Sequence, residues 1–153
     1  TTREDAAKYM QGADQKRLEN IVNGALGFVG KKAKVASIGW CFGGGWSLKS
    51  AILSKKQAVG SVMYYGMPVQ DVEKLKTLNC EVLGLFATEE WISKQVIEEF
   101  AVNMKTANKS LNYKIFEAAH AFANPSNPKF DEKAATEANA MAVKFLKEKF
   151  KLK

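Results

Sequence analysis

The chain has 153 residues, of which 46% are hydrophobic and 25% are charged, and its formal net charge is +7. These values are typical of one globular domain that is long enough to bury a sizeable core. We expect neither a membrane nor a nucleic acid as a partner, because no apolar run approaches the roughly 20 residues of a membrane span and the lysines are scattered along the sequence.

Two helices are predicted at the start of the chain. Thr1 and Glu4 have the spacing of a capping box, which would open a short helix that ends near Gln11. Asp14 is predicted to begin a second helix and Gly30 to end it. The apolar residues of this second helix fall on one face, namely Leu18, Ile21, Val22, Ala25, Leu26 and Val29.

Strands and helices alternate after this point. Strands are predicted over residues 34–38, 59–65, 81–87 and 111–117, and helices over residues 46–53, 69–78, 93–107 and 131–150. Short, almost continuously apolar strands joined by crossover helices are typical of a mostly parallel sheet with helices on both faces. We therefore predict an α/β fold in a single domain over residues 1–153, with functional residues at the carboxyl ends of the strands.

The segment Gly39-Trp-Cys-Phe-Gly-Gly44 follows the first of these strands and precedes a helix. It matches the nucleophile-elbow pattern G-x-Nuc-x-G, with Cys41 as the nucleophile. Such a sharp turn crowds the residues two before and two after the nucleophile, so neither should tolerate a Cβ atom. The turn would strain Cys41 and aim the N–H of Phe42 at a developing oxyanion. The alternative is a glycine-rich turn with an inert, buried cysteine.

Two further groups follow later strands and would meet Cys41 at the same edge of the sheet. Glu89 and Glu90 follow the third strand and His120 follows the fourth, in the chain order of α/β-hydrolases. A histidine beside a thiol can accept its proton and later return it to a leaving group, while a carboxylate fixes the imidazole tautomer. The alternatives are a surface histidine and a solvated acidic start of the helix near Ser93.

The cysteine and histidine content limits the other chemistry that we expect. Cys41 and Cys80 have no paired spacing, and we interpret both as reduced thiols, with Cys80 in the core. One histidine cannot build a zinc cluster, so we expect no metal and no cofactor. No signal peptide is visible, and we expect a cytoplasmic protein, although Thr1 is not an initiating residue and a leader could have been lost.

Together these motifs resemble those of dienelactone hydrolases, over nearly the whole chain. The resemblance is carried by Gly39–Gly45, Tyr64-Tyr-Gly66, the acidic turn that ends in Trp91, and His120-Ala-Phe-Ala123. It implies an α/β-hydrolase fold and a Cys-Asp-His triad that acts on small-molecule esters or lactones. By this resemblance the nucleophile is Cys41, the base is His120, an oxyanion donor is the backbone of Phe42, and the substrate pocket includes Trp91, Tyr65 and Asn124.

Two departures from the family concern the sheet and the pocket. The family has further strands before the helix near Thr1, so we expect this chain to be the C-terminal portion of a longer domain. An N-terminal segment or a second copy would complete the sheet. Asn124 stands where the family carries an arginine that grips the substrate carboxylate, and an amide offers no charged fork. This argues against activity on dienelactone itself, but not against ester or lactone hydrolysis in general.

The third departure is that the acidic turn is one residue shorter than in the family. Counting forward from Phe86 places the acid at Glu90, whereas counting back from Trp91 places it at Glu89. One inserted residue would satisfy both counts, and we hypothesise that a residue, the acidic one itself, is missing here, with a break between the two glutamates. If the chain is continuous, one glutamate must reach His120.

Two other functions remain open on the sequence alone. A non-catalytic interaction module that keeps the fold would account for the short acidic turn and the lack of N-terminal strands. A redox-sensing thiol is a third interpretation, but no resolving cysteine lies near Cys41 in the sequence.

Overall fold

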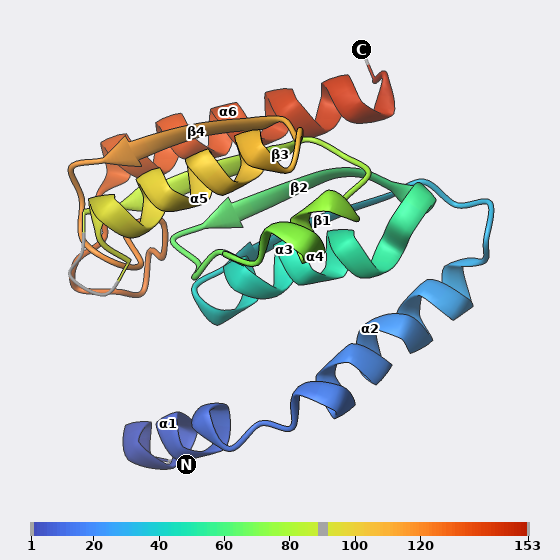
Figure 1. Ribbon diagram of the computed structural model, residues 1–153. Helices are drawn as coiled ribbons and strands as arrows, with labels where there is room; N and C mark the ends of the chain where they lie inside the picture. Colours follow the sequence, from blue (N-terminus) through green and yellow to red (C-terminus); the bar gives the residue numbers. More distant parts are fainter. Residues whose placement is uncertain (1, 89–91, 153) are drawn as a thin grey trace. The chain divides into compact units, whose positions relative to one another are not determined.

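The computed structural model describes residues 2–88 and 92–152 (Figure 1). The chain divides into two compact units, Thr1–Ala33 and Lys34–Lys153. The hypothesis about the acidic turn concerns Glu89, Glu90 and Trp91, which lie outside the described residues, as does Thr1.

The first unit consists of helices α1 (Arg3–Gln11) and α2 (Gln15–Val29). A capping box opens α1, and it pairs Thr2 with Asp5. The box predicted for Thr1 and Glu4 is therefore one residue too early. The shorter acid suffices because its carboxylate still reaches the N–H of Thr2, at 3.0 Å. Asp14 caps α2 as predicted, and Gly30 ends it with a φ of 81°. No residue of α2 is buried.

The second unit is built on a four-stranded sheet in the order β1-β2-β3-β4. Its strands are β1 (Val35–Trp40), β2 (Ala58–Tyr64), β3 (Val82–Ala87) and β4 (Leu111–Phe116). Every neighbouring pair is parallel. The predicted parallel α/β fold is therefore confirmed. Within the described ranges no strand precedes β1, which leaves β1 and β4 as the two edge strands of this sheet.

Helices cover both faces of the sheet (Figure 1). One face packs against α3 (Phe42–Ser54), α4 (Val72–Lys76) and α5 (Lys94–Thr106), and the other packs against α6 (Glu132–Phe150). A short 3₁₀ turn, Lys55–Gln57, links α3 to β2. Because successive residues of a strand point to opposite faces, Phe86 joins the core under α5 while Leu85 joins the core under α6.

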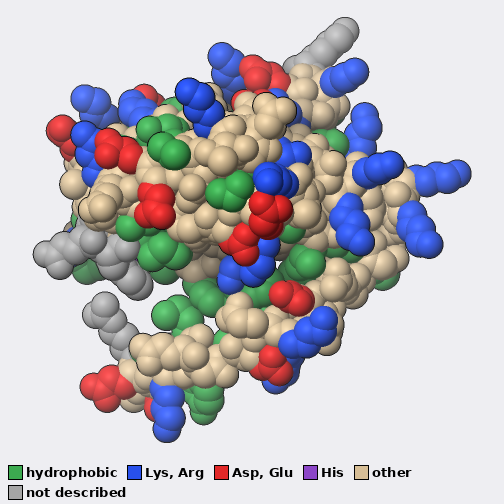
Figure 2. Space-filling view, in the orientation of Figure 1, with side chains coloured by type: hydrophobic (Ala, Val, Ile, Leu, Met, Phe, Trp, Pro, Cys, Tyr) green, Lys and Arg blue, Asp and Glu red, His purple; other side chains and the backbone are tan. Residues whose placement is uncertain are grey.

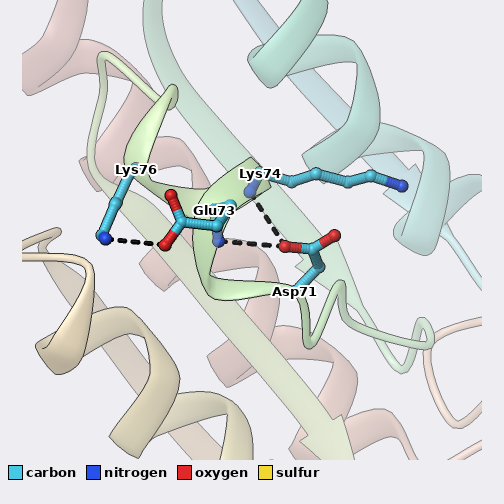
Figure 3. A network of polar contacts seen from close by, with 4 residues as sticks. All are labelled: Asp71, Glu73, Lys74 and Lys76. Atoms are coloured by element: carbon cyan, nitrogen blue, oxygen red, sulfur yellow. Dashed lines mark hydrogen bonds and ion pairs between the residues drawn. The ribbon is translucent and has the colours of Figure 1, made fainter.

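The helix boundaries differ most from the prediction at α3 and α4. α3 begins four residues earlier than the predicted start at Trp46, because the weak helix propensity of its glycines is overridden by packing. α4 is limited to five residues. Asp71 caps it by accepting hydrogen bonds from the N–H groups of Glu73 and Lys74, at 2.9 and 3.1 Å, and Lys76 pairs with Glu73 (Figure 3). Such exposed contacts stabilise little, so burial of Leu75 anchors this turn.

The surface carries mixed charge. Figure 2 shows Lys and Arg side chains at several separate places on the visible face, with Asp and Glu side chains between them. None of the helices in the described part of the chain has both the length and the apolar character that a bilayer crossing requires.

Candidate functional site

A strained turn joins β1 to α3 through the single residue Cys41. Its backbone has φ 55° and ψ −122°, a conformation that costs a non-glycine residue about 1–3 kcal/mol. Hydrogen bonds hold it on both sides. The N–H of Cys41 donates to the carbonyl of Tyr64 at 3.0 Å, and its own carbonyl accepts from Gly44 at 2.9 Å. The strained strand-to-helix turn predicted around Cys41 is therefore present.

The glycines before and after Cys41 differ in the space that surrounds them. A Cβ atom on Gly39 would lie 2.0 Å from the carbonyl oxygen of Gly43, which no side chain tolerates. A Cβ atom on Gly43 would have no atom within 4 Å outside its own helix and its neighbours. The expectation is thus right for Gly39 and wrong for Gly43, whose missing side chain would face open space.

Gly44 and Gly66 allow α3 to lie close to β2, and no role was predicted for either of them. A Cβ atom on Gly44 would lie 2.6 Å from the carbonyl oxygen of Tyr64, and one on Gly66 would lie 2.3 Å from the nitrogen of Gly45. The first turn of α3 therefore lies directly against the carboxyl end of β2. The repeated glycines at 43–45 and 66 were the available signal, but nothing in the sequence places these two segments in contact.

Hydroxyl groups fasten α3 to the sheet further along the helix. The Oγ atoms of Ser47 and Ser61 are 2.9 Å apart, and both side chains are buried. Ser37 of β1 donates to the carbonyl of Ser47 at 2.8 Å. Satisfied buried hydrogen bonds of this kind specify one arrangement, so α3 cannot slide along β1 and β2.

His120 lies beside Cys41, although the two are 79 positions apart in the chain. The Nε2 atom of the imidazole is 3.0 Å from Sγ. His120 is carried by the loop that follows β4, and the fully buried Phe122 anchors this loop in the core. Because the carboxyl ends of parallel strands share one edge of the sheet, the loops after β1 and β4 can reach each other, as predicted.

Tyr65 follows β2 and completes the surroundings of this pair. Its ring is buried, and its centroid lies 5.1 Å from that of His120. Burial raises the pKa of the Tyr65 hydroxyl to about 12, a backbone hydrogen bond from Ala123 opposes this rise, and the charge of Cys41 adds to it. The phenol is therefore neutral at any physiological pH.

A small pocket of about 290 Å³ opens beside Cys41. Its described lining residues are Trp40, Cys41, Tyr65, Ala121, Ala123, Asn124 and Pro125. None of these described lining residues is an acid, a lysine or an arginine. The predicted pocket residues Tyr65 and Asn124 thus do line a cavity together with Cys41, and Trp40 is a lining residue that the sequence analysis did not assign to the pocket.

Of the remaining predicted site residues, the structure describes only Phe42. Phe42 is the first residue of α3, and its N–H lacks an acceptor within the helix, as every first helical N–H does. Its role as an oxyanion donor stays a prediction. The proposed acids Glu89 and Glu90 and the proposed pocket wall Trp91 lie outside the described residues, so the acidic member of the site also stays a prediction.

The second cysteine differs from the first in position and environment. Cys80 packs half-buried against the core, just before β3 begins, whereas Cys41 lies at the carboxyl end of β1. Burial raises the pKa of the Cys80 thiol to about 11, an effect that the charge of Lys149 only partly offsets. Both thiols are free. Over the part of the chain that the structure describes, no group of three or more potential metal-binding side chains occurs.

The fold and the site define a class of protein. A parallel sheet, helices on both faces and a cysteine–histidine pair at the carboxyl edge are typical of the α/β-hydrolase class. A family model described as the dienelactone hydrolase family matches residues 1–150, and the chain belongs to this family.

Similarity to individual proteins agrees with this assignment. The chain is 28% identical over 120 residues to carboxymethylenebutenolidase 1 of Cupriavidus pinatubonensis, covering 74% of this chain and 48% of that protein. It is also 28% identical over 115 residues to a Saccharolobus solfataricus protein provisionally named a carboxymethylenebutenolidase, covering 74% of this chain and 44% of that protein. The chain therefore spans about half the length of these relatives.

Two solved structures have the same fold. One is a Klebsiella pneumoniae protein provisionally named a dienelactone hydrolase, with a TM-score of 0.69 and 23% identity over 85% of this chain and 59% of that one. The other is a dienelactone hydrolase-like promiscuous phosphotriesterase from metagenomic libraries. Its TM-score is 0.73, with 18% identity over 94% of this chain and 66% of that one.

The unequal space around the two glycines predicts unequal effects of alanine. We expect Gly39→Ala to lower the free energy of unfolding by about 2 kcal/mol, because its Cβ would collide with backbone. The matched control Gly43→Ala should be neutral or should gain up to about 1 kcal/mol, since alanine favours a helix. Urea unfolding measures both. Equal destabilisation by the two variants would contradict this account of the turn.

The two thiols should also react at different rates. At about pH 8, iodoacetamide should alkylate Cys41 at least about tenfold faster than Cys80, because a thiol with a raised pKa carries little thiolate. Labelling of Cys80 should continue to increase as the pH approaches about 11. Peptide mass spectrometry after timed labelling distinguishes the two sites, and the urea-unfolded chain provides the control in which the rates converge. Faster labelling of Cys80 in the folded protein would refute the expectation.

Proposed function

We propose that this protein hydrolyses ester or lactone carbonyls, with Cys41 as the nucleophile and His120 as its general base. The observation that supports this most strongly is the 3.0 Å contact between Nε2 of His120 and Sγ of Cys41, on a strained turn that opens into a pocket. Membership in the dienelactone hydrolase family agrees with hydrolytic chemistry.

In the proposed reaction, Nε2 of His120 accepts the thiol proton while Sγ of Cys41 attacks the carbonyl carbon. The carbonyl oxygen takes the negative charge and is stabilised by the N–H of Phe42, a type of contact worth about 10²–10³ in rate. When the tetrahedral intermediate collapses, the bond to the leaving oxygen breaks and His120 returns the proton to that oxygen. A water molecule, deprotonated by His120, then attacks the thioester, which releases the acid and restores the thiol.

The third member of the triad is proposed to be an acid of the turn after β3. Glu89 or Glu90 would bond the other imidazole nitrogen and stabilise the imidazolium that forms during attack.

The edge of β1 is proposed to pair with an N-terminal segment or with a second copy of the chain. The exposure of Ile38 and Trp40, at 42% and 45%, agrees with a strand that has such a neighbour in the complete assembly.

The pocket supports a neutral substrate. Its described lining has no cation that could bind a carboxylate, and Asn124 uses its Oδ1 to accept a hydrogen bond from the N–H of Ser126 at 3.0 Å. We therefore propose uncharged small esters or lactones rather than dienelactone, and no metal or cofactor takes part in the proposed steps.

Removal of the thiol tests the nucleophile. Cys41→Ala should abolish turnover of a chromogenic short-chain ester while the protein remains folded, because alanine occupies the same turn without a nucleophile. Prior alkylation of the wild type with iodoacetamide should have the same effect. The matched control is Cys80→Ala, which should retain turnover. If the purified Cys41→Ala protein hydrolyses the ester at the wild-type rate, Cys41 is not the nucleophile.

Replacement of the imidazole tests the base. His120→Gln should fold normally and lower kcat by at least about a hundredfold, in line with general-base contributions, and no second histidine can substitute for it. Circular dichroism checks the fold, and steady-state kinetics on the same ester measure the loss. Activity within about threefold of wild type would exclude His120 from the mechanism.

A further inference from the structure

Tyr65 occupies a backbone conformation that a tyrosine rarely adopts. Its φ is 35°, which is in the left-handed region where a bulky side chain is strained. Such strain persists only when the surroundings impose it, and it is concentrated at functional sites. In this protein β3 holds the strained backbone in place, because the N–H of Tyr65 donates to the carbonyl of Leu85 on that strand at 2.8 Å.

The side chain of Tyr65 joins two parts of the site that the backbone does not connect. Its ring lies 5.1 Å from the His120 ring and 5.2 Å from the Phe122 ring, centroid to centroid. Its hydroxyl is bonded by the backbone of Ala123, three residues after His120. Tyr65 therefore contacts the loop that carries the imidazole while its own backbone is held by the sheet.

The chemistry proposed above uses no phenol. With its pKa raised to about 12, the hydroxyl cannot act as a base near neutral pH, and its backbone hydrogen bond already gives it a structural partner. The ring, by contrast, packs against the imidazole, with the centroids 5.1 Å apart and the two planes tilted by 60°. A ring packed in this way limits rotation of the imidazole, which must keep Nε2 directed at Sγ throughout the proposed reaction.

We propose that Tyr65 is a positioning residue whose ring holds the imidazole of His120 against the thiol of Cys41. The expected effect of this positioning on catalysis rests on the proposed function, whereas the expected effect on the reactivity of Cys41 does not. In this view the strained turn at Tyr65 is required because an extended backbone would carry the ring away from the loop. The ring is the essential part, and the hydroxyl is not.

Three variants distinguish the role of the Tyr65 ring from that of its hydroxyl and from the general loss of a buried aromatic ring. Tyr65→Phe keeps the ring, Tyr65→Leu removes it, and Tyr64→Leu is the matched control. Tyr64 is equally buried at the end of the same strand. It stacks on Trp40 at 5.1 Å, meets the edge of the Tyr65 ring at 6.0 Å and bonds Asn139, so it tests loss of a neighbouring ring that is not the one against His120. The rate of alkylation of Cys41 by iodoacetamide and the steady-state constants on a chromogenic ester are measured for each, with Cys80 as the internal reference thiol.

We expect Tyr65→Leu to slow alkylation of Cys41, but not of Cys80, by about tenfold, because a misplaced imidazole no longer draws the proton from the thiol. The kcat on the ester should fall by a similar factor. Because Tyr65 also lines the pocket, a change in KM alone does not count as support for the positioning role. Tyr65→Phe should restore both rates, and Tyr64→Leu should leave both within about threefold of wild type.

The outcomes distinguish this inference from the proposed function. If Tyr65→Leu is alkylated at Cys41 at the wild-type rate, the positioning role is wrong, whatever the esterase activity. If alkylation slows as expected but the wild type hydrolyses no ester, the positioning role stands and the proposed function fails.

A measurement on the wild type applies if Tyr65→Leu does not fold, which rapid alkylation of Cys80 would reveal. The chain has one histidine, so its imidazole NMR signals are unambiguous. Nuclear Overhauser contacts between the His120 and Tyr65 rings are expected in the folded protein. Their absence would overturn the proposal.

Discussion

The site depends on the close approach of the first turn of α3 to the carboxyl end of β2. Gly44 and Gly66 leave no room for a side chain between these segments, where a Cβ atom would come within 2.6 and 2.3 Å of backbone atoms. With the helix held this close, β1 can turn into α3 through Cys41 alone, and the strain at that residue is compensated by its hydrogen bond to Tyr64.

The same contact determines what surrounds the thiol. Since β2 ends beside the turn, the next residue, Tyr65, extends toward the loop after β4 and meets His120 there. The loop is anchored in turn by Phe122, which packs against the ring of Tyr65. Thus three strand ends, those of β1, β2 and β4, converge on one pocket, and each contributes one side chain to the cysteine–histidine pair or to its support. A parallel order of strands is what brings these ends to one edge.

Stability is distributed unevenly around this site. β2 and β3 are central strands with almost fully buried side chains, whereas β1, which leads to Cys41, is an edge strand of the described sheet. Among the described residues, the strained turn is supported from the side of β2, by backbone contacts and by buried hydroxyls.

Local interactions explain how much of this protein could be predicted from its sequence. The order and type of the elements follow from caps and periodicity within single segments, such as Asp14 and Gly30 at the ends of α2, and the strained turn follows from glycines around Cys41. Local rules did not resolve which of two adjacent threonines caps α1, or that two of three adjacent glycines, Gly44 and Gly45, are confined by backbone while Gly43 is not. Those outcomes depend on how closely segments approach one another.

The contacts of the site itself belong to the tertiary structure. Residues 79 positions apart come within 3.0 Å of each other only because separate strands end at one edge, and the ring of Tyr65 reaches the imidazole only through a backbone conformation that its sequence does not favour. The sequence alone determined that a cysteine, an acid and a histidine each follow a different predicted strand, in that order along the chain. Only the folded chain decided which side chains surround the cysteine and the histidine, because packing between distant segments, not local propensity, determines those distances.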